Sequence, residues 1–387
     1  MDATQLLSII AKGEDSTHQF KKTVTHAETI AQELVALSNA SGGLLFVGVD
    51  DDGKISGLVG EDISKINQLI SNASTNCIRP PINPKTENVS FPNGIVIVVT
   101  VEPGISKPYT DHQGNVWVKN GADKRKVTAR EELQRMYQAA ALVHADELPV
   151  VGTSVSDLDR TYFADFFTKI TGETLEEQDL SLQQLLENMN LMRDGQLNIC
   201  GTLLFSQRPA LKLPIFIVKA VSFPGNDITA QSYLDSQDIS GKMSDVFQQS
   251  LSFMLRNIHH KQGEQSVNSI GEPEIPRIAL EELLANALIH RDYFISAPIR
   301  LLIFSNRIEI ISPGHLPNNL TINNIKLGNS NIRNPILASF ATRVLPYRGL
   351  GSGVLRALRA WPHIDLIDDR EGNQFKAVVY RSTESTI

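Results

Sequence analysis

Two short motifs near the C-terminal end carry residue types that can bind and hydrolyse a phosphate anhydride. The first, EELLANALIHRDY at 281–293, places Glu282 and Asn286 four residues apart. On a helix this spacing projects both side chains from one face, so they can act on one metal-bound phosphate and its attacking water. The second motif, RGLGSGV at 348–354, has glycines that let the backbone approach a polyphosphate. We expect a helix at 354–360, whose first amides would face the anion.

Each motif alone also has an ordinary structural interpretation. Glu282 can be a solvated helix charge, Asn286 a satisfied polar side chain, and the glycine run a surface loop. The segment between the motifs favours the functional interpretation. It contains apolar stretches at 299–304 and 308–311 separated by the turn sequence Ser-Asn-Arg, which predicts a strand hairpin. The predicted order is therefore helix, hairpin, loop, variable segment, glycine loop and helix.

This order resembles the GHKL (Bergerat) ATPase fold, in the branch of bacterial ATP-binding regulators whose N-terminal half is Schlafen-like. The resemblance implies that ATP and magnesium are the ligands. It implies that Glu282 is the general base for ATP hydrolysis and that Asn286 holds magnesium. The phosphate-binding glycines would be Gly349, Gly351 and Gly353.

One position departs from the family pattern. The family usually has an aspartate two residues before the first glycine of the loop that follows the hairpin, and here Ser312 precedes Gly314. A hydroxyl accepts a hydrogen bond without the charge that strengthens an aspartate acceptor, so we expect weaker selection of adenine. The family places a lid in the following segment, where Asn331 and Arg333 are candidate phosphate or ribose contacts. For Arg333 a surface position is the alternative.

A second set of residues lies near the N-terminus. An amphipathic helix is predicted at 27–41, ended by two glycines, followed by a buried strand at 44–49 and an Asp-rich turn. With EDSTHQFK at 14–21, PY at 108–109 and WVKNG at 117–121, these elements resemble the AlbA-type domain of the Schlafen superfamily over about 130 residues. In Schlafen nucleases that domain uses three acids, which map here onto Glu14, Gln19 and Asp50. Glutamine lacks the charge a divalent metal prefers, so this cluster is degenerate and nuclease activity is disfavoured. Glu14 as a helix-end charge and Asp50 as a turn residue are the structural alternatives.

Nucleic-acid binding has a separate indication in a basic stretch beside Trp117. Phosphate contacts from such a stretch bind DNA or RNA without reading bases. A solvated surface is the alternative. The candidate cations are Lys21, Lys22, Lys119, Lys124, Arg125, Lys126 and Arg130.

Composition limits the class of protein. The chain has 387 residues, 41% of them hydrophobic, and a net charge of −7, which disfavours indiscriminate coating of nucleic acid. Cys77 and Cys200 are the two cysteines and lack metal-ligand spacing. The sequence shows neither a signal peptide nor an apolar run long enough to span a membrane. We therefore expect a cytoplasmic homo-oligomer without a membrane partner.

The middle of the chain is predicted to be mixed. We expect helices at 162–171, 180–191 and 240–258, a strand or hairpin at 197–205, a strand at 215–221 and a loop at 261–269. The segment resembles the linker module that joins the two halves in the same bacterial family.

The sequence thus predicts an α/β (α+β) protein with a Schlafen AlbA-like domain at 1–145, a connecting module at 146–270 and a GHKL-like domain at 271–387. The leading hypothesis is an ATP-binding protein with slow ATPase activity that controls nucleic-acid binding. The resemblance implies a setting in transcription regulation or in phage defence and stress responses. A nucleotide-regulated, metal-dependent RNase or DNase and a non-catalytic interaction scaffold are the alternatives.

Overall fold

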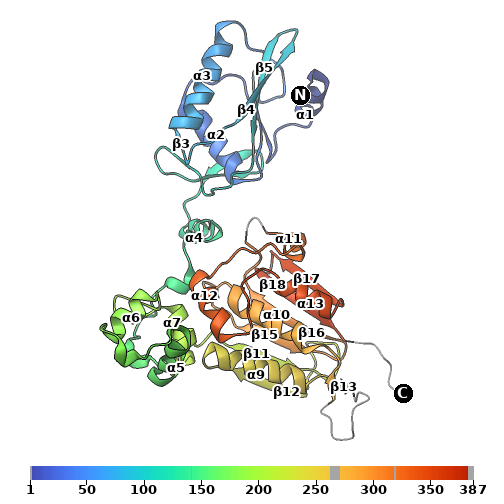
Figure 1. Ribbon diagram of the computed structural model, residues 1–387. Helices are drawn as coiled ribbons and strands as arrows, with labels where there is room; N and C mark the ends of the chain where they lie inside the picture. Colours follow the sequence, from blue (N-terminus) through green and yellow to red (C-terminus); the bar gives the residue numbers. More distant parts are fainter. Residues whose placement is uncertain (1, 141, 262–270, 318–319, 382–387) are drawn as a thin grey trace. The chain divides into compact units, whose positions relative to one another are not determined.

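The computed structural model describes residues 2–140, 142–261, 271–317 and 320–381 (Figure 1). The chain forms two compact units, residues 1–143 and 144–387, here called unit 1 and unit 2. Both combine helices with β-sheet, so the predicted mixed α/β class is confirmed. No helix in the described ranges is long and apolar enough to cross a bilayer.

Unit 1 is built on a four-stranded sheet with the order β1-β2-β5-β4. Strands β1 and β2 pair in parallel, and the other neighbours are antiparallel. The elements are α1 (Ala3–Ile10), β1 (His18–Lys21), α2 (Ala27–Asn39), β2 (Gly43–Val47), α3 (Glu61–Asn76), β3 (Ile78–Arg79), β4 (Lys85–Phe91), β5 (Gly94–Val101), β6 (Thr110–Asp111), β7 (Trp117–Asn120), β8 (Asp123–Lys126) and α4 (Arg130–Ala139).

Helix α2 and strand β2 follow the predicted pattern. Ile30, Leu34 and Leu37 form the buried stripe of α2, which packs with α3 against one face of the sheet. The chain then turns sharply at Gly42, which has a φ of +78°, and a Cβ there would lie 2.6 Å from the Val101 carbonyl oxygen. Glycine is needed for this turn because both the backbone conformation and the close approach exclude a side chain. The opposite face of the sheet packs against α1.

Unit 2 contains a six-stranded sheet with the order β12-β11-β15-β16-β18-β17. Strands β11 and β15 pair in parallel, and the remaining neighbours are antiparallel. The helices are α5 (Arg160–Thr171), α6 (Leu182–Asn188), α7 (Ile199–Phe205), α8 (Pro209–Lys212), α9 (Met243–Arg256), α10 (Arg277–His290), α11 (Ile322–Lys326), α12 (Pro335–Val344) and α13 (Gly353–Ala360). The strands are β9 (Met192–Arg193), β10 (Gln196–Leu197), β11 (Val218–Ser222), β12 (Asp235–Ile239), β13 (His260–Lys261), β14 (Glu272–Pro273), β15 (Ile299–Ile303), β16 (Arg307–Pro313), β17 (Ile364–Asp369) and β18 (Gln374–Tyr380).

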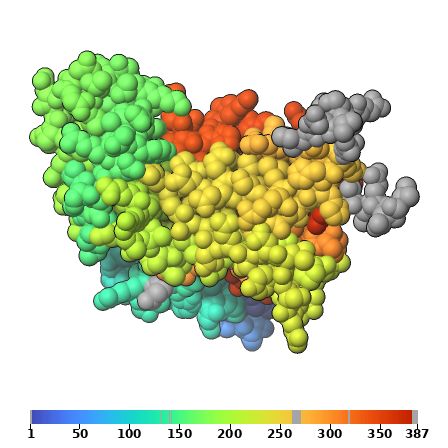
Figure 2. Space-filling model, turned by 90° about the horizontal axis from the view of Figure 1, so that it is seen from below, coloured from blue at the N-terminus to red at the C-terminus, as the bar shows by residue number. Residues whose placement is uncertain are grey.

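One continuous apolar core joins this sheet to its helices. Side chains from β11, β15, β16 and β18 bury against α9, α10, α12 and α13. Figure 1 shows these helices and the sheet in unit 2. The same core extends into α5, α6 and α7, and Figure 2 shows the green to yellow-green segment of 144–212 lying against the yellow segment of α9. The sheet therefore takes strands from both sides of residue 270.

Most predicted elements of unit 2 are confirmed. The hairpin is β15 and β16, the helix after the glycine motif is α13, and the strand near 215–221 is β11. The strand or hairpin predicted at 197–205 is wrong, because 199–205 forms helix α7. The Asn198 side chain caps this helix and accepts a hydrogen bond from Gly201 N at 2.7 Å. Every residue of α7 is buried, and a short apolar run that is buried all round has no periodicity to distinguish helix from strand. The loop predicted at 261–269 lies, from 262 onward, outside the described residues.

Candidate functional site

A single pocket in unit 2 gathers the nucleotide-site residues that the sequence singled out. Its walls come from α10, the end of β16, the segment 329–333, the glycine loop at 349–353 and the start of α13. The space between these walls is about 1020 Å³, with the open solvent at its mouth included. The predicted residues that line it are Glu282, Asn286, Ser312, Gly314, Asn331, Arg333, Gly349, Gly351 and Gly353.

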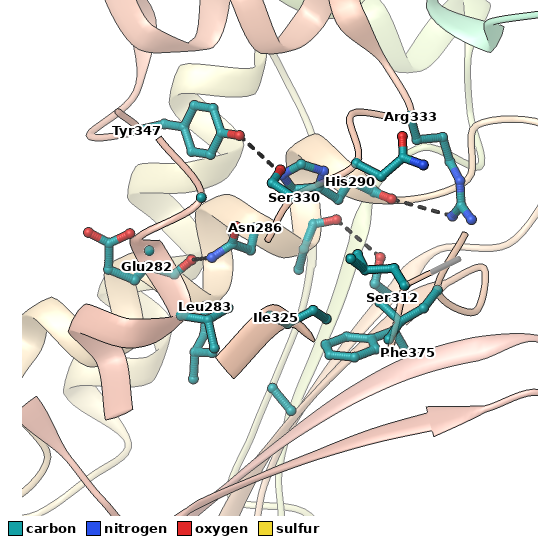
Figure 3. A pocket seen from close by; sticks show the side chains of 18 of the residues that line it. Glu282, Leu283, Asn286, His290, Ser312, Ile325, Ser330, Arg333, Tyr347 and Phe375 are labelled. Atoms are coloured by element: carbon teal, nitrogen blue, oxygen red, sulfur yellow. Dashed lines mark hydrogen bonds between the residues drawn. The ribbon is translucent and has the colours of Figure 1, made fainter. Parts of the chain in front are cut away.

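Helix α10 presents the two polar groups of the first motif. Asn286 Nδ2 donates to the Glu282 carbonyl oxygen at 2.7 Å, one turn earlier on the helix (Figure 3). This bond uses the amide nitrogen, and within the described residues no donor reaches Asn286 Oδ1. The carboxamide oxygen is therefore available as a hard ligand, which suits Mg²⁺, since this ion takes one or two protein oxygens and fills its shell with phosphate and water.

The glycine loop allows a close approach to α10. Gly349 and Gly351 have φ values of +69° and +68°, in the left-handed region that favours glycine. Gly353 is the first residue of α13, and a Cβ there would lie 2.6 Å from Glu282 Oε2 and 3.1 Å from Asn286 Nδ2. The amides at the start of α13 thus lie directly beside the two polar side chains, which is an arrangement suited to an anion.

The pocket also has apolar lining side chains, which suit an aromatic base. They are Leu283, Ile310, Ile325, Phe375 and Ala377. Ser312 lies buried among them, and its hydroxyl donates to the Ala287 carbonyl oxygen at 3.1 Å. The Ser312 oxygen keeps its lone pairs, so it can accept a hydrogen bond from an exocyclic amino group.

Arg333 is partly buried, lines the pocket and is held there by two backbone carbonyls. Its guanidinium donates to the His315 carbonyl oxygen at 2.7 Å and to the His290 carbonyl oxygen at 3.5 Å. Burial lowers the pKa of Arg333 and lowers that of His290 to about 4, with the Arg333 charge adding to the effect on His290. His290 Nε2 lies 3.1 Å from the Tyr347 hydroxyl, whose pKa burial raises. Neither His290 nor Tyr347 was predicted from the sequence.

Arg356, which forms an ion pair with Glu282, was also not predicted from the sequence. Arg356 Nε donates to Glu282 Oε1 at 2.7 Å, and a second guanidinium nitrogen contacts the same oxygen. The two residues are 74 positions apart, so helical spacing within one motif does not reveal the pair. Glu282 Oε2 is buried and has no hydrogen-bond partner in the part of the chain that the structure describes.

The N-terminal acids lie in a different environment. Glu14 accepts hydrogen bonds from Gln19 Nε2 and from Phe20 N, while Gln19 Oε1 accepts one from Lys119 Nζ at 2.6 Å. Asp50 accepts from Ser56 Oγ at 2.8 Å, and this bond holds the Asp50 pKa below its ordinary value. Across the described ranges, no three His, Cys, Asp or Glu side chains are grouped to hold a metal.

Most of the candidate cations of unit 1 are paired with acids. Lys124 and Lys21 lie 2.6 and 3.8 Å from the buried Glu33 carboxylate, a residue that the sequence analysis did not single out. Arg125 pairs with Glu132 at 2.6 Å, and Lys22 lies 3.4 Å from Asp50. The basic stretch is the hairpin of β7 and β8.

Three candidate cations have no acid partner among the described residues, and one of them, Lys119, is instead held by Gln19 Oε1 and the Ala122 carbonyl oxygen. Lys126, at the end of β8, and Arg130, at the start of α4, are exposed and have no partner among the described residues. They are the cations of the set best placed to contact a phosphate backbone.

Two family comparisons bear on the site. Residues 14–128 match the family "Schlafen, AlbA_2", and residues 296–370 match HATPase_c_4, described as "Putative ATP-dependent DNA helicase recG C-terminal". The chain therefore has a Schlafen AlbA-type domain at its N-terminal end and an ATPase-like domain at its C-terminal end, as predicted. The ATPase-like domain supports nucleotide binding.

Two of the solved structures that match are distant likenesses. The DIP2311 protein from Corynebacterium diphtheriae is 21% identical with a TM-score of 0.47, over 98% of this chain and 80% of that one. The N-terminal domain of a protein titled "Putative ATP-dependent DNA Helicase RecG-related Protein", from Nitrosomonas europaea, is 21% identical with a TM-score of 0.24, over 34% of this chain and 96% of that one. Among curated proteins none matches.

Proposed function

We propose that this protein binds ATP with magnesium in the unit 2 pocket, hydrolyses it slowly, and uses the bound nucleotide to control nucleic-acid binding by the Schlafen AlbA-type domain. The observation that carries the nucleotide part is the convergence of α10, Ser312 and the glycine loop on one pocket. A polar wall beside the amides of α13 suits the phosphates, and the apolar lining side chains suit the base.

Residues of the chain divide the chemistry between them. Magnesium, when bound, neutralises phosphate charge, and Asn286 Oδ1 is the protein oxygen placed to hold it. Glu282 is placed to accept the proton of the attacking water, because its carboxylate lies beside Gly353 at the start of α13. Buried apolar side chains line part of the pocket, and charged contacts beside them are screened less than contacts in bulk water.

The proposed coupling between the pocket and unit 1 is supported by the residues that directly follow unit 1 in the chain. His144 Nδ1 lies 3.1 Å from the Arg333 carbonyl oxygen, and the fully buried Asp146 carboxylate accepts from Leu337 N, in the first turn of α12, at 2.8 Å. Burial raises the pKa of Asp146. A nucleotide that shifts the 329–333 wall would therefore move the chain at the point where it continues into unit 1. The family resemblance implies transcription regulation, or phage defence and stress responses, as the setting of this control.

Thermal unfolding with and without ATP and magnesium tests the nucleotide part. A ligand at 100 times its dissociation constant stabilises the native state by about 2.7 kcal/mol, so unit 2 should melt at a higher temperature. Asn286→Ala should lose the magnesium-dependent portion of the shift. GTP giving the same shift as ATP would show that Ser312 does not select adenine. No shift with any nucleotide would leave the interaction scaffold as the better description.

Fluorescence anisotropy of labelled DNA and RNA, with and without ATP, tests the control. We expect the affinity for nucleic acid to change when ATP and magnesium are added. The Asn286→Ala variant serves as the control, because it should bind nucleic acid with an affinity that is independent of ATP. Equal affinity with and without ATP in the native protein would contradict the coupling.

A further inference from the structure

Arg356 binds the same Glu282 carboxylate that the proposed mechanism needs as a general base. Arg356 contacts Glu282 Oε1 through two guanidinium nitrogens, and it also donates to Ser352 Oγ at 3.2 Å. The Glu282 side chain is 6% exposed and that of Arg356 is 22% exposed, so the pair is shielded from solvent. A carboxylate oxygen held by a guanidinium fork has fewer lone pairs left for a water proton.

The pair is also incompletely satisfied. Glu282 Oε2 is buried without a hydrogen-bond partner in the described residues. A buried ion pair repays its desolvation only when its remaining lone pairs are satisfied, so this one is held less firmly than a fully bonded pair. The geometry is therefore suited to an exchange of partners.

Arg356 also lines the pocket in which the phosphates of a nucleotide would bind. It lies in the first turn of α13, directly after the glycine loop. A guanidinium matches the geometry of a phosphate with two parallel hydrogen bonds. Of the other described arginines that line the pocket, Arg333 is bound to backbone carbonyls and Arg348 is exposed. Arg356 is thus the cation beside both Glu282 and the phosphate-binding amides.

We infer that Arg356 is a terminal-phosphate sensor: it exchanges the Glu282 carboxylate for the terminal phosphate of a nucleoside triphosphate and so releases Glu282 to act on water. The inference rests on the proposed function and adds a specificity to it. A triphosphate recruits Arg356, whereas a diphosphate leaves the Glu282–Arg356 pair intact. The pocket then discriminates triphosphate from diphosphate through the same side chain that governs access to the general base.

Titration calorimetry with magnesium and either ADP or a non-hydrolysable ATP analogue tests the inference. A charge-assisted hydrogen bond contributes about 1.5–3 kcal/mol. Arg356→Ala should therefore lower the affinity for the ATP analogue by about 10-fold or more, and change the affinity for ADP much less. Arg356→Lys should restore part of the preference, because it keeps the charge without the fork. Arg359→Ala, an exposed arginine three residues further along α13, is the matched control and should keep the native preference.

Two further variants separate sensing from a purely structural role. Glu282→Gln removes the carboxylate that competes for Arg356, so it should tighten binding of the triphosphate analogue several-fold while leaving ADP unchanged. Glu282→Gln/Arg356→Ala leaves no unpaired buried charge, so it should fold normally and still lack the preference for triphosphate.

The outcomes distinguish this inference from the proposed function. If the native protein binds the analogue and ADP, and Arg356→Ala keeps the ratio of their affinities, Arg356 is only a structural partner of Glu282. If Glu282→Gln does not tighten the analogue, the exchange of partners is overturned. If the native protein binds neither nucleotide, the proposed function itself fails.

Discussion

Spaced sequence motifs predicted both the nucleotide pocket of unit 2 and the acidic cluster of unit 1. In the structure the side chains of the two sites have different surroundings. In the pocket, Glu282 and Asn286 lie on one helix face and meet the glycine loop at Gly353. In unit 1, Glu14 is bonded to the amide of Gln19, and Gln19 in turn binds the Lys119 ammonium. At the position where the Schlafen resemblance implies an acid, Gln19 thus links the Glu14 carboxylate to the Lys119 ammonium. The pocket of unit 2 depends on one helix and on backbone amides, so it tolerates side-chain substitutions at other positions. A metal site that needs three acidic side chains is lost when one of them is replaced.

The largest expected effect is a loss of ATP hydrolysis without a loss of ATP binding. Glu282→Gln removes the general base, which contributes typically about 10²–10⁴-fold, so ATP turnover should fall by about that factor. Phosphate release gives the rate, and calorimetry verifies that nucleotide still binds. Turnover equal to that of the native protein would remove Glu282 from the mechanism.

The next effect tests the close approach of the glycine loop. In Gly353→Ala the new methyl would lie 2.6 Å from Glu282 Oε2, so the loop must move away from α10. We expect ATP affinity to fall by about 10-fold or more, since a displacement of this size disrupts several phosphate contacts. Gly225→Ala is the matched control, because a Cβ there meets no atom within 4 Å. Native affinity in Gly353→Ala would show that the phosphates bind elsewhere.

The third effect concerns pH. His290 has its pKa lowered to about 4 in the folded protein, below its ordinary value near 6.5, so the unfolded chain takes up the proton first. Stability should therefore be full above pH 6.5 and fall as the pH drops toward 4. By pH 5 the loss from this group is at most about 2 kcal/mol, because each pH unit corresponds to about 1.4 kcal/mol.

Urea unfolding of unit 2, followed by Trp361 fluorescence in a Trp117→Phe background, measures this loss. His290→Gln should flatten the pH dependence between pH 6.5 and 5. His260→Gln, at an exposed position, should not. An unchanged slope in His290→Gln would assign the acid sensitivity to other groups.

The fourth effect distinguishes free cations from paired ones in unit 1. Lys126→Ala and Arg130→Ala should each weaken nucleic-acid binding several-fold across sequences and reduce the salt slope by about one unit. Arg125→Ala should have a smaller effect, because Glu132 already pairs with Arg125 at 2.6 Å. Equal effects at all three positions would mean that the ion pair opens when nucleic acid binds.

The last prediction is that the protein has no nuclease activity. With magnesium or manganese the protein should leave single-stranded RNA, tRNA and DNA intact. Gln19→Glu alone should also be inactive, because the Lys119 ammonium 2.6 Å from Gln19 Oε1 would pair with the new carboxylate. Metal-dependent cleavage by the native protein that disappears in Glu14→Ala would reverse this conclusion and favour the nuclease.

What the sequence predicted well was local. The hairpin of β15 and β16, helix α13 and the stripe of α2 follow from periodicity and turn residues within a short window. What it missed depends on partners far along the chain: Arg356 meets Glu282 across 74 positions, and Lys124 meets Glu33 across 91. Helix α7 was missed for a different reason, since burial on all sides removes the amphipathic pattern. Which acid pairs with which base therefore becomes visible only in the folded structure.

The parallel pairing of β11 with β15 has a consequence for how unit 2 assembles. The paired residues Val218 and Ile299 are separated by about 80 positions, so closing this contact has a larger entropic cost than forming the antiparallel β15–β16 hairpin. The hairpin should therefore form early and the β11–β15 seam late. Pulsed hydrogen exchange during refolding would show protection at β16 before protection at β11. The pocket, whose walls lie on α10, β16 and β18, would then be assembled around the early half of the sheet.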